Sequence, residues 1–200
     1  MSEINIKKII ENLIDTFLKA GKISLELRKK GLIKKIKKDN TPVTNGDLEV
    51  NKIITSKIIE LTPNIPIISE ETSDNKTLEN LKDFWLIDPI DGTHDYLNNL
   101  EEFTINAGLI VERKPVAGLI YAPAKNRMFF SYGENSAFEL INEKATKLNS
   151  AKNFNKNEIK FVSYSNKLKP EIEKIHKELN VKKYTKMKSS LKFCVVAAGE

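Results

Sequence analysis

The segment from Trp85 to His94 constrains the fold of this chain more than any other part of the sequence. Its apolar start, Trp85-Leu86-Ile87, is followed by Asp88-Pro89-Ile90-Asp91-Gly92-Thr93. Because proline has no N–H and a fixed φ, we expect a strand to end at Asp88 and the chain to turn there. Such a turn can aim the Asp88 and Asp91 carboxylates and the Ile90 carbonyl at a single point. Oxygen ligands that converge in this way suit Mg²⁺.

Gly92 and Thr93 place a candidate anion site beside the candidate metal site. Glycine lets backbone N–H groups approach an anion closely, and threonine offers a hydroxyl next to them. Metal and phosphate sites side by side indicate hydrolysis of a phosphate ester. A plainer alternative stays open at this point, because a strand that ends in D-P-x-D-G is also an ordinary turn.

The composition indicates a globular chain that can bury a core. Of its 200 residues, 40% are hydrophobic and 30% are charged, which suits one ordinary domain or two small lobes. No apolar run approaches the roughly 18 residues of a membrane span, and the N-terminus lacks the pattern of a signal peptide. The single cysteine, Cys194, excludes an internal disulfide and fits a reducing cytosol, and we expect it to be buried.

The formal charge of +6 is unevenly distributed, because residues 22–38 hold eight basic side chains and one acid, Glu26. A surface of this kind could attract nucleic acid, a membrane surface or a polyanionic small molecule. The plainer interpretation is a solvated, lysine-rich face. No aromatic residue lies among these lysines to stack bases, so we expect no nucleic-acid partner.

The periodicity of apolar residues predicts two helices followed by a run of antiparallel strands, which is an α+β layered architecture. The first helix covers residues 5 to about 30 and stops at Gly31, and the second begins near Gly46. We then expect strands at 65–69, 84–88, 104–111, 116–121, 128–132 and 137–141. A surface loop at 144–160, a strand at 161–164 and helices at 170–180 and 188–198 complete the pattern. We therefore expect an N-terminal lobe of residues 1–144 and a second, incomplete lobe of residues 145–200.

Two further segments supply acidic residues. Ile67-Ile68-Ser69-Glu70-Glu71 is an apolar strand that ends in paired acids, one of which could join the metal site. In the segment 39–47, Asp47 lies near a predicted helix start, where helix capping is the alternative to a role in the site.

In these three segments, 39–47, 68–71 and 85–93, the sequence resembles the inositol monophosphatase superfamily of metal-dependent, lithium-sensitive phosphatases. The third segment is close to the family signature W-[LIV]-[LIV]-D-P-[LI]-D-G-T. The resemblance covers essentially the whole chain. It implies the layered αβαβα sandwich of the inositol monophosphatase and fructose-1,6-bisphosphatase type.

Within that superfamily the chain looks most like the CysQ-type 3′(2′),5′-bisphosphate nucleotidase branch. The similar segments are 101–110, 114–124 and 189–199, where inositol monophosphatases usually differ. This likeness implies hydrolysis of the 3′-phosphate of adenosine 3′,5′-bisphosphate to AMP and phosphate, in connection with sulfate assimilation. It implies a cytoplasmic protein and allows peripheral attachment to the inner membrane face. The oligomeric state stays open.

Two other functions also stay open. One is an inositol monophosphatase with the same metal site. The other is a non-catalytic relative that binds anions or nucleic acid through its basic face.

The resemblance carries metal-binding roles over position by position and implies two or three Mg²⁺ ions. Glu70, Asp88 and the Ile90 carbonyl would hold the first ion. Asp88 and Asp91 would share the second. Substrate would be bound by residues drawn from the same strand ends and turn, namely Glu70, Ile90, Asp91, Gly92 and Thr93.

The resemblance also implies how the attacking water is handled. Asp47 and Thr93 would form a hydrogen-bonded pair that orients this water beside Glu70. Lys38, which precedes the first motif, could assist contacts with phosphate or with a water on the metal.

The chain departs from the branch pattern in two places. His94 replaces a basic residue, and we expect it to have no catalytic role. The family's last motif, W-D-x-A-A-G, supplies an aspartate to the second metal, and it does not occur before Glu200. Either the chain is a fragment or the gene product is truncated and lacks one ligand. We expect a fragment that lacks the C-terminal part of the fold.

Overall fold

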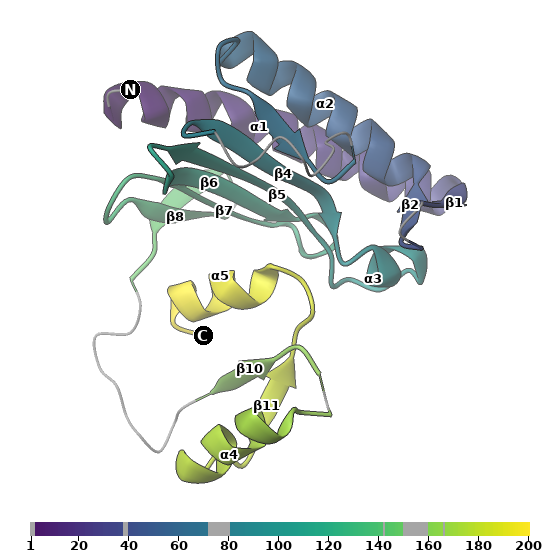
Figure 1. The fold of residues 1–200 in the computed structure, drawn as a ribbon, viewed down its shortest axis with the longest axis vertical. Helices are drawn as coiled ribbons and strands as arrows, with labels where there is room; N and C mark the ends of the chain where they lie inside the picture. Colours follow the sequence, from purple (N-terminus) through teal and green to yellow (C-terminus); the bar gives the residue numbers. More distant parts are fainter. Residues whose placement is uncertain (1–2, 38–39, 72–80, 142, 150–159, 166) are drawn as a thin grey trace.

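A computed structural model describes residues 3–37, 40–71, 81–141, 143–149, 160–165 and 167–200. Figure 1 shows five layers: a pair of long helices, a large sheet, a single helix, a small sheet and a last helix. The αβαβα order implied by the resemblance is therefore confirmed for this chain.

The first layer consists of α1 (Glu3–Lys30) and α2 (Asn45–Leu61), and it confirms both predicted helices. Each helix buries one apolar stripe against the large sheet, and Phe17 of α1 and Ile54 of α2 are fully enclosed. After α1 the chain passes through Gly31 at φ +102°, a conformation that glycine adopts without a steric penalty.

The large sheet has seven strands in the order β3-β4-β5-β6-β7-β8-β9. Only β3 and β4 are parallel, and the remaining neighbours are antiparallel. The strands are β3 (Ile67–Ser69), β4 (Phe84–Asp91), β5 (Thr104–Val111), β6 (Lys114–Ala122), β7 (Arg127–Tyr132), β8 (Ala137–Ile141) and β9 (Lys144–Lys147). On β4, Trp85 and Ile87 face the helices, whereas Leu86 and Asp88 face the opposite side.

The expected end of the strand at Asp88 needs correction. β4 does not end at Asp88 but continues through Pro89 to Asp91, with a shift of register between Asp88 and Asp91. Asp88 pairs with Asn106 and Asp91 pairs with Thr104, so β4 contains one residue more than β5 over this stretch. Pro89 lies in this bulge, where the missing N–H does not interrupt the ladder.

The predicted loop from residue 144 also begins later than expected. β9 adds a strand at the edge of the sheet before the chain leaves it, and residues 150–159 of that loop lie outside the described ranges. A second short element, the hairpin of β1 (Lys34–Ile36) and β2 (Pro42–Thr44), was also not expected. The division into lobes at residue 144 stays a prediction.

The elements beyond the sheet form the other three layers. They are α5 (Leu191–Ala198), the parallel pair β10 (Phe161–Ser163) and β11 (Tyr184–Lys186), and α4 (Pro170–Glu178). α5 is shorter than predicted and lies between the two sheets (Figure 1). Two short helical pieces follow β4 and β6, α3 (Thr93–Leu97) and the 3-10 turn η2 (Pro123–Lys125). Within the described ranges, none of the helices has both the length and the apolar character that a membrane crossing requires.

Gly46 offers a test of the packing that holds the start of α2. A Cβ atom there would lie 2.3 Å from the hydroxyl oxygen of Tyr96, which is fully buried. We expect Gly46→Ala to lower the free energy of unfolding by about 1–3 kcal/mol, measured by urea denaturation. Gly108→Ala is the control, because its Cβ would meet nothing closer than Ile110 Cδ1 at 4.0 Å. Equal losses in the two variants would contradict this account.

Candidate active site

Glu70 and Asp88 meet where the parallel strands β3 and β4 end, and we call this border of the large sheet, with Glu70, Glu71, Asp88 and Asp91, the acidic edge. β3 and β4 run parallel with Ser69 opposite Ile87, so the next residue of each strand emerges at the same edge. The Glu70 N–H donates to the Ile87 carbonyl at 3.1 Å, which continues the ladder to this point. The Glu70 and Asp88 side chains lie within hydrogen-bonding reach of each other.

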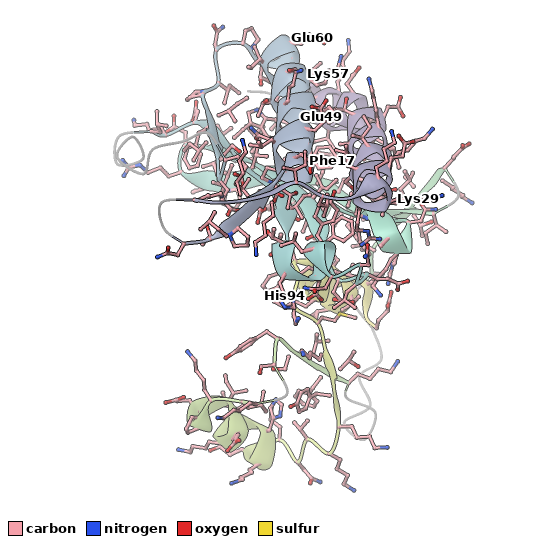
Figure 2. The ribbon with its side chains drawn as sticks, turned by 90° about the vertical axis from the view of Figure 1, so that its right-hand side faces the viewer. Phe17, Lys29, Glu49, Lys57, Glu60 and His94 are labelled. Atoms are coloured by element: carbon pink, nitrogen blue, oxygen red, sulfur yellow. The ribbon has the colours of Figure 1, made fainter. Side chains whose placement is uncertain are left out.

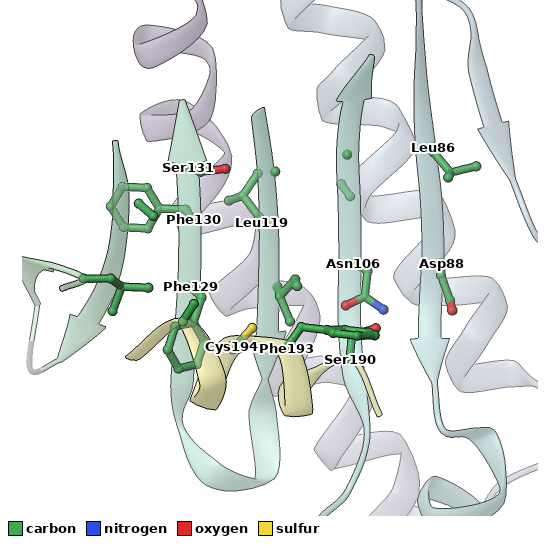
Figure 3. A pocket seen from close by; sticks show the side chains of 17 residues that line it. Leu86, Asp88, Asn106, Leu119, Phe129, Phe130, Ser131, Ser190, Phe193 and Cys194 are labelled. Atoms are coloured by element: carbon green, nitrogen blue, oxygen red, sulfur yellow. The ribbon is translucent and has the colours of Figure 1, made fainter. Parts of the chain in front are cut away.

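Asp88 is the most perturbed carboxyl group of this edge. Burial, followed by the negative charges of Glu70 and Asp91, raises its pKa to about 8, although the Ile90 N–H donates to the carboxylate. Its Oδ1 atom is buried and has no hydrogen-bond partner in the described part of the chain. Asn106, directly opposite on β5, has an unpartnered buried Oδ1 as well. Figure 3 shows the Asp88 and Asn106 side chains on neighbouring strands of this part of the sheet, so their oxygen atoms gather there.

The turn after β4 has the positive φ and the close backbone approach that were expected at Gly92 for an anion site. Gly92 has φ +93°, and a Cβ atom there would lie 2.6 Å from the Glu102 carbonyl oxygen, so the turn requires glycine. Thr93 begins α3, whose first N–H groups have no partner within the helix. The Thr93 hydroxyl donates to the Ile90 carbonyl at 3.2 Å.

The Asp47 carboxylate is bound within its own helix start. Its Oδ2 accepts hydrogen bonds from the N–H of Thr44 at 2.9 Å and from the Thr44 hydroxyl. The Asp47 N–H donates in turn to Thr44 Oγ1 at 3.3 Å, which completes a capping box. Asp47 and Thr93 are both described, and their expected direct pairing is not formed in this structure. Asp47 thus caps the start of α2 in this structure, and its expected role with Thr93 in the site stays a prediction. Burial raises the pKa of Asp47, and the nearby charge of Glu70 also raises it.

Lys37 contributes a contact that the sequence analysis did not anticipate. Its Nζ lies 3.2 Å from Glu70 Oε1 and 2.8 Å from Glu71 Oε1. Burial lowers the pKa of Lys37, but the contacts with Glu71 and Glu70 outweigh this effect and raise it overall. Glu71 itself is only 4% exposed. Lys38, which the sequence analysis named instead, lies outside the described residues.

The start of α5 reaches the same turn from a distant part of the chain. Asp91 Oδ2 accepts hydrogen bonds from the Ser190 N–H at 2.6 Å and from the Ser190 hydroxyl at 2.7 Å. Asp95 pairs with Lys188 at 2.6 Å and with the exposed His94 at 3.0 Å. In Figure 2, His94 lies at the lower end of the part formed by α1, α2 and the large sheet, on the side toward α4.

α5 and the sheet enclose a pocket of about 480 Å³ that is lined by Asp88, Asn106, Ser190, Phe193 and Cys194 among others (Figure 3). Cys194 is buried, as expected, and burial raises the pKa of its thiol to about 12.

The residues of this edge fit Mg²⁺. No three carboxylate, imidazole or thiol side chains within the described residues lie close enough to complete a metal site by themselves. Mg²⁺ does not need three, because it keeps several waters and is usually held by one or two carboxylates. The unpartnered Oδ1 of Asp88, with Glu70 beside it and the charge of Asp91 nearby, provides such a donor set.

Comparison with known proteins agrees with this fold and site. The model of the inositol monophosphatase family matches residues 5–200. The 3′(2′),5′-bisphosphate nucleotidase CysQ of Buchnera aphidicola is 35% identical over 197 residues, which cover 96% of this chain and 73% of that protein. CysQ of Escherichia coli K12 is 34% identical over 167 residues, or 82% of this chain and 65% of that protein. The match thus spans about two thirds to three quarters of these relatives.

Solved structures show the same architecture. The crystal structure of CysQ from Bacteroides thetaiotaomicron superimposes with a TM-score of 0.72 at 26% identity and covers 96% of this chain and 77% of that one. SuhB from Bartonella henselae, at 21% identity, has a TM-score of 0.76 over 96% of this chain and 75% of that one, which is a likeness of fold. The chain belongs to the inositol monophosphatase family.

The raised pKa of Asp88 makes a prediction about stability. Because this pKa is about 8 in the native protein and 3.8 is the usual value, the native state keeps a proton that the unfolded chain releases between these pH values. Stability should therefore fall as the pH rises from about 4 to 8. We expect Asp88→Asn, in a chelator without metal, to melt several degrees above the unsubstituted protein at pH 8.

The difference should largely disappear below pH 3.8, where the Asp88 carboxyl is protonated in the native protein and in the unfolded chain. Asp15→Asn, at an exposed position of α1, serves as the control for a simple change of net charge. A melting temperature of Asp88→Asn below that of the unsubstituted protein at pH 8 would contradict the account.

Lys37 makes a second prediction. Its ammonium group offsets the repulsion between Glu70 and Glu71, so Lys37→Met should lower the melting temperature of the metal-free protein by a few degrees. Added Mg²⁺ should remove most of this deficit by replacing the lost positive charge. Lys35→Met, at an exposed lysine of β1 two residues before Lys37, is the matched control. A deficit of the same size with and without Mg²⁺ would show that Lys37 acts only through packing.

Proposed function

We propose that this chain carries the active site of a Mg²⁺-dependent phosphatase that hydrolyses the 3′-phosphate of adenosine 3′,5′-bisphosphate. The family membership supports a phosphatase, and the relatives named 3′(2′),5′-bisphosphate nucleotidase CysQ support this substrate class. The observation that carries the proposal is the buried, unpartnered Asp88 oxygen between two other carboxylates. With Asp88 ionised, such an arrangement is unfavourable unless a cation joins it.

The proposed assignment of ligands follows the strand ends. Glu70, Asp88 and the Ile90 carbonyl would hold the first Mg²⁺, and Asp88 with Asp91 would hold the second. Mg²⁺ supplies Lewis-acid polarisation of the phosphate, activation of a water molecule and stabilisation of the leaving oxygen. Two ions are proposed from these residues, with a third left to the measured stoichiometry.

The chain's own residues would orient the substrate and move one proton. The backbone around Gly92 and the Thr93 hydroxyl would bind the phosphate, next to Ile90 and Asp91. Glu70, whose side chain is about half exposed, would accept a proton from the attacking water. The water oxygen would form a bond to phosphorus while the bond from phosphorus to the ribose 3′ oxygen breaks. That oxygen would then take up a proton from solvent, and Glu70 would return its proton to solvent.

Asp47 has a proposed role in the substrate complex that differs from its role here. The resemblance pairs it with Thr93 to orient the water, which would require the Thr93 hydroxyl to leave the Ile90 carbonyl. The capping box keeps the Asp47 carboxylate buried beside the charge of Glu70 in either case. Both Asp47 and Thr93 remain proposed catalytic residues on this basis.

The basic surface supports a substrate with two phosphates. Lys29 and Lys30 end α1, Lys34 and Lys35 are exposed on β1, and this hairpin leads directly to Lys37 at the acidic edge. We propose a cytoplasmic protein, and the same surface would support peripheral contact with an anionic membrane face.

The test is a comparison of substrates and variants in the complete protein. We expect Mg²⁺-stimulated phosphate release from adenosine 3′,5′-bisphosphate, and Asp91→Asn should reduce it at least about 100-fold while circular dichroism shows an intact fold. His94→Gln, at an exposed position, should remain close to the unsubstituted protein.

Two results would overturn parts of the proposal. Faster hydrolysis of inositol 1-phosphate than of the nucleotide would replace the substrate by that of an inositol monophosphatase. Salt-sensitive nucleic-acid binding without any Mg²⁺-stimulated phosphate release would favour a non-catalytic binding protein.

A further inference from the structure

We propose that Ser190, at the start of α5, is a positioning residue for Asp91, through which α5 controls the affinity of the metal site. The inference rests on the proposed function, because it assigns Asp91 to a metal ion. It concerns an interaction between two residues separated by 99 positions in the chain. Neither residue's motif predicts this contact.

The geometry of the contact is specific to one carboxylate oxygen. Both the N–H and the hydroxyl of Ser190 donate to Asp91 Oδ2, at 2.6 and 2.7 Å. Hydrogen bonds to an ionised acceptor are short and strong. Two donors on the same oxygen restrict rotation of the carboxylate and leave Oδ1 as the oxygen that a cation can use.

Ser190 makes this contact instead of the one that its position usually favours. A serine before a helix normally accepts a hydrogen bond from the first turn of that helix. Ser190 is the N-cap residue of α5, yet it has φ −61° and ψ −13° and its side chain makes no cap hydrogen bond. The hydroxyl is directed to Asp91, and the positive end of the α5 dipole lies beside this carboxylate.

A second contact fixes the same segment to the same turn. Lys188 Nζ lies 2.6 Å from Asp95 Oδ1, and the Asp95 side chain is 4% exposed. The Lys192 side chain donates to the carbonyls of Lys188 and Ser189, which holds the residues before α5 in a compact turn. Residues 188–190 therefore hold Asp91 at the end of β4 and Asp95 in α3, on either side of the turn proposed to bind phosphate.

The body of α5 is fixed independently, so it can serve as a support. Leu191, Cys194 and Val195 pack in a buried cluster with Ala122 and Phe129 of the large sheet. At the far end, Arg127 of β7 pairs with Glu139 of β8 and with Glu200, which follows α5. A rigid helix anchored at both ends holds Ser190 in place, and Ser190 in turn holds Asp91.

The experiment compares three variants of the complete protein. Ser190→Ala removes the hydroxyl, Ser190→Thr keeps it, and Ser131→Ala removes a hydroxyl from another wall of the same pocket without touching Asp91. Binding of Mn²⁺ and Mg²⁺ is measured by calorimetry without substrate, beside melting temperatures and the dependence of kcat/KM on ion concentration.

We expect Ser190→Ala to weaken binding of the ion that Asp91 holds by about tenfold, which is the usual effect of one hydrogen bond to a charged group. Its kcat/KM should fall at low ion concentration and recover in excess ion. Ser190→Thr should retain the affinity, and Ser131→Ala should match the unsubstituted protein.

Unchanged ion affinity in Ser190→Ala, with or without a lower melting temperature, would overturn the inference and leave Ser190 a structural residue. Failure of the proposed function is distinguishable from this result. If the unsubstituted protein binds ions and Ser190→Ala weakens that binding, the positioning role stands even where the nucleotide is not the substrate. If the unsubstituted protein binds neither ion, both proposals fall.

Discussion

The main constraint on this structure is a cluster of carboxylates, Glu70, Asp88 and Asp91, that repel one another where strands β3 and β4 end. Asp88 has lost water and faces the charges of Glu70 and Asp91, which together hold its pKa near 8. An arrangement of this kind opposes folding, so the remainder of the molecule must supply the stability that maintains it. The contacts between α1, α2 and the large sheet provide that support, because their apolar stripes form one continuous core beneath the acidic edge.

The positive groups around this edge come from three separate parts of the chain. Lys37 approaches from the β1–β2 hairpin, Lys188 from the segment before α5, and the N–H of Ser190 from α5 itself. Each satisfies a different acid, namely Glu71, Asp95 and Asp91. Among the described acids Glu70, Glu71, Asp88 and Asp91, only Asp88 has a buried oxygen, Oδ1, without a hydrogen-bond partner. The metal is therefore proposed at Asp88, the acid whose buried oxygen receives no hydrogen bond from the described residues.

The sequence predicted the regular elements and the acidic motif well, and it failed where a contact depends on the tertiary fold. Long apolar stripes identified α1 and α2, and alternation identified β5 to β8, because burial imposes those patterns. β1 and β9 are short and exposed, so they carry no such pattern. The position of Asp47 near a helix start left capping open beside a role in the site. Lys37 and Ser190 meet their acids across 34 and 99 residues and leave no local signal.

The bulge at Pro89 decides on which side of the sheet the two motif aspartates emerge. Side chains alternate along a regular strand, so residues three apart would point to opposite faces. The extra residue in β4 makes Asp88 and Asp91 face partners on β5 that are two apart, Asn106 and Thr104, and this returns both carboxylates to the same face. Losing or gaining one residue here would direct an aspartate into the apolar layer under the helices. The length of this segment is therefore as strict a requirement for the site as the identity of its acids.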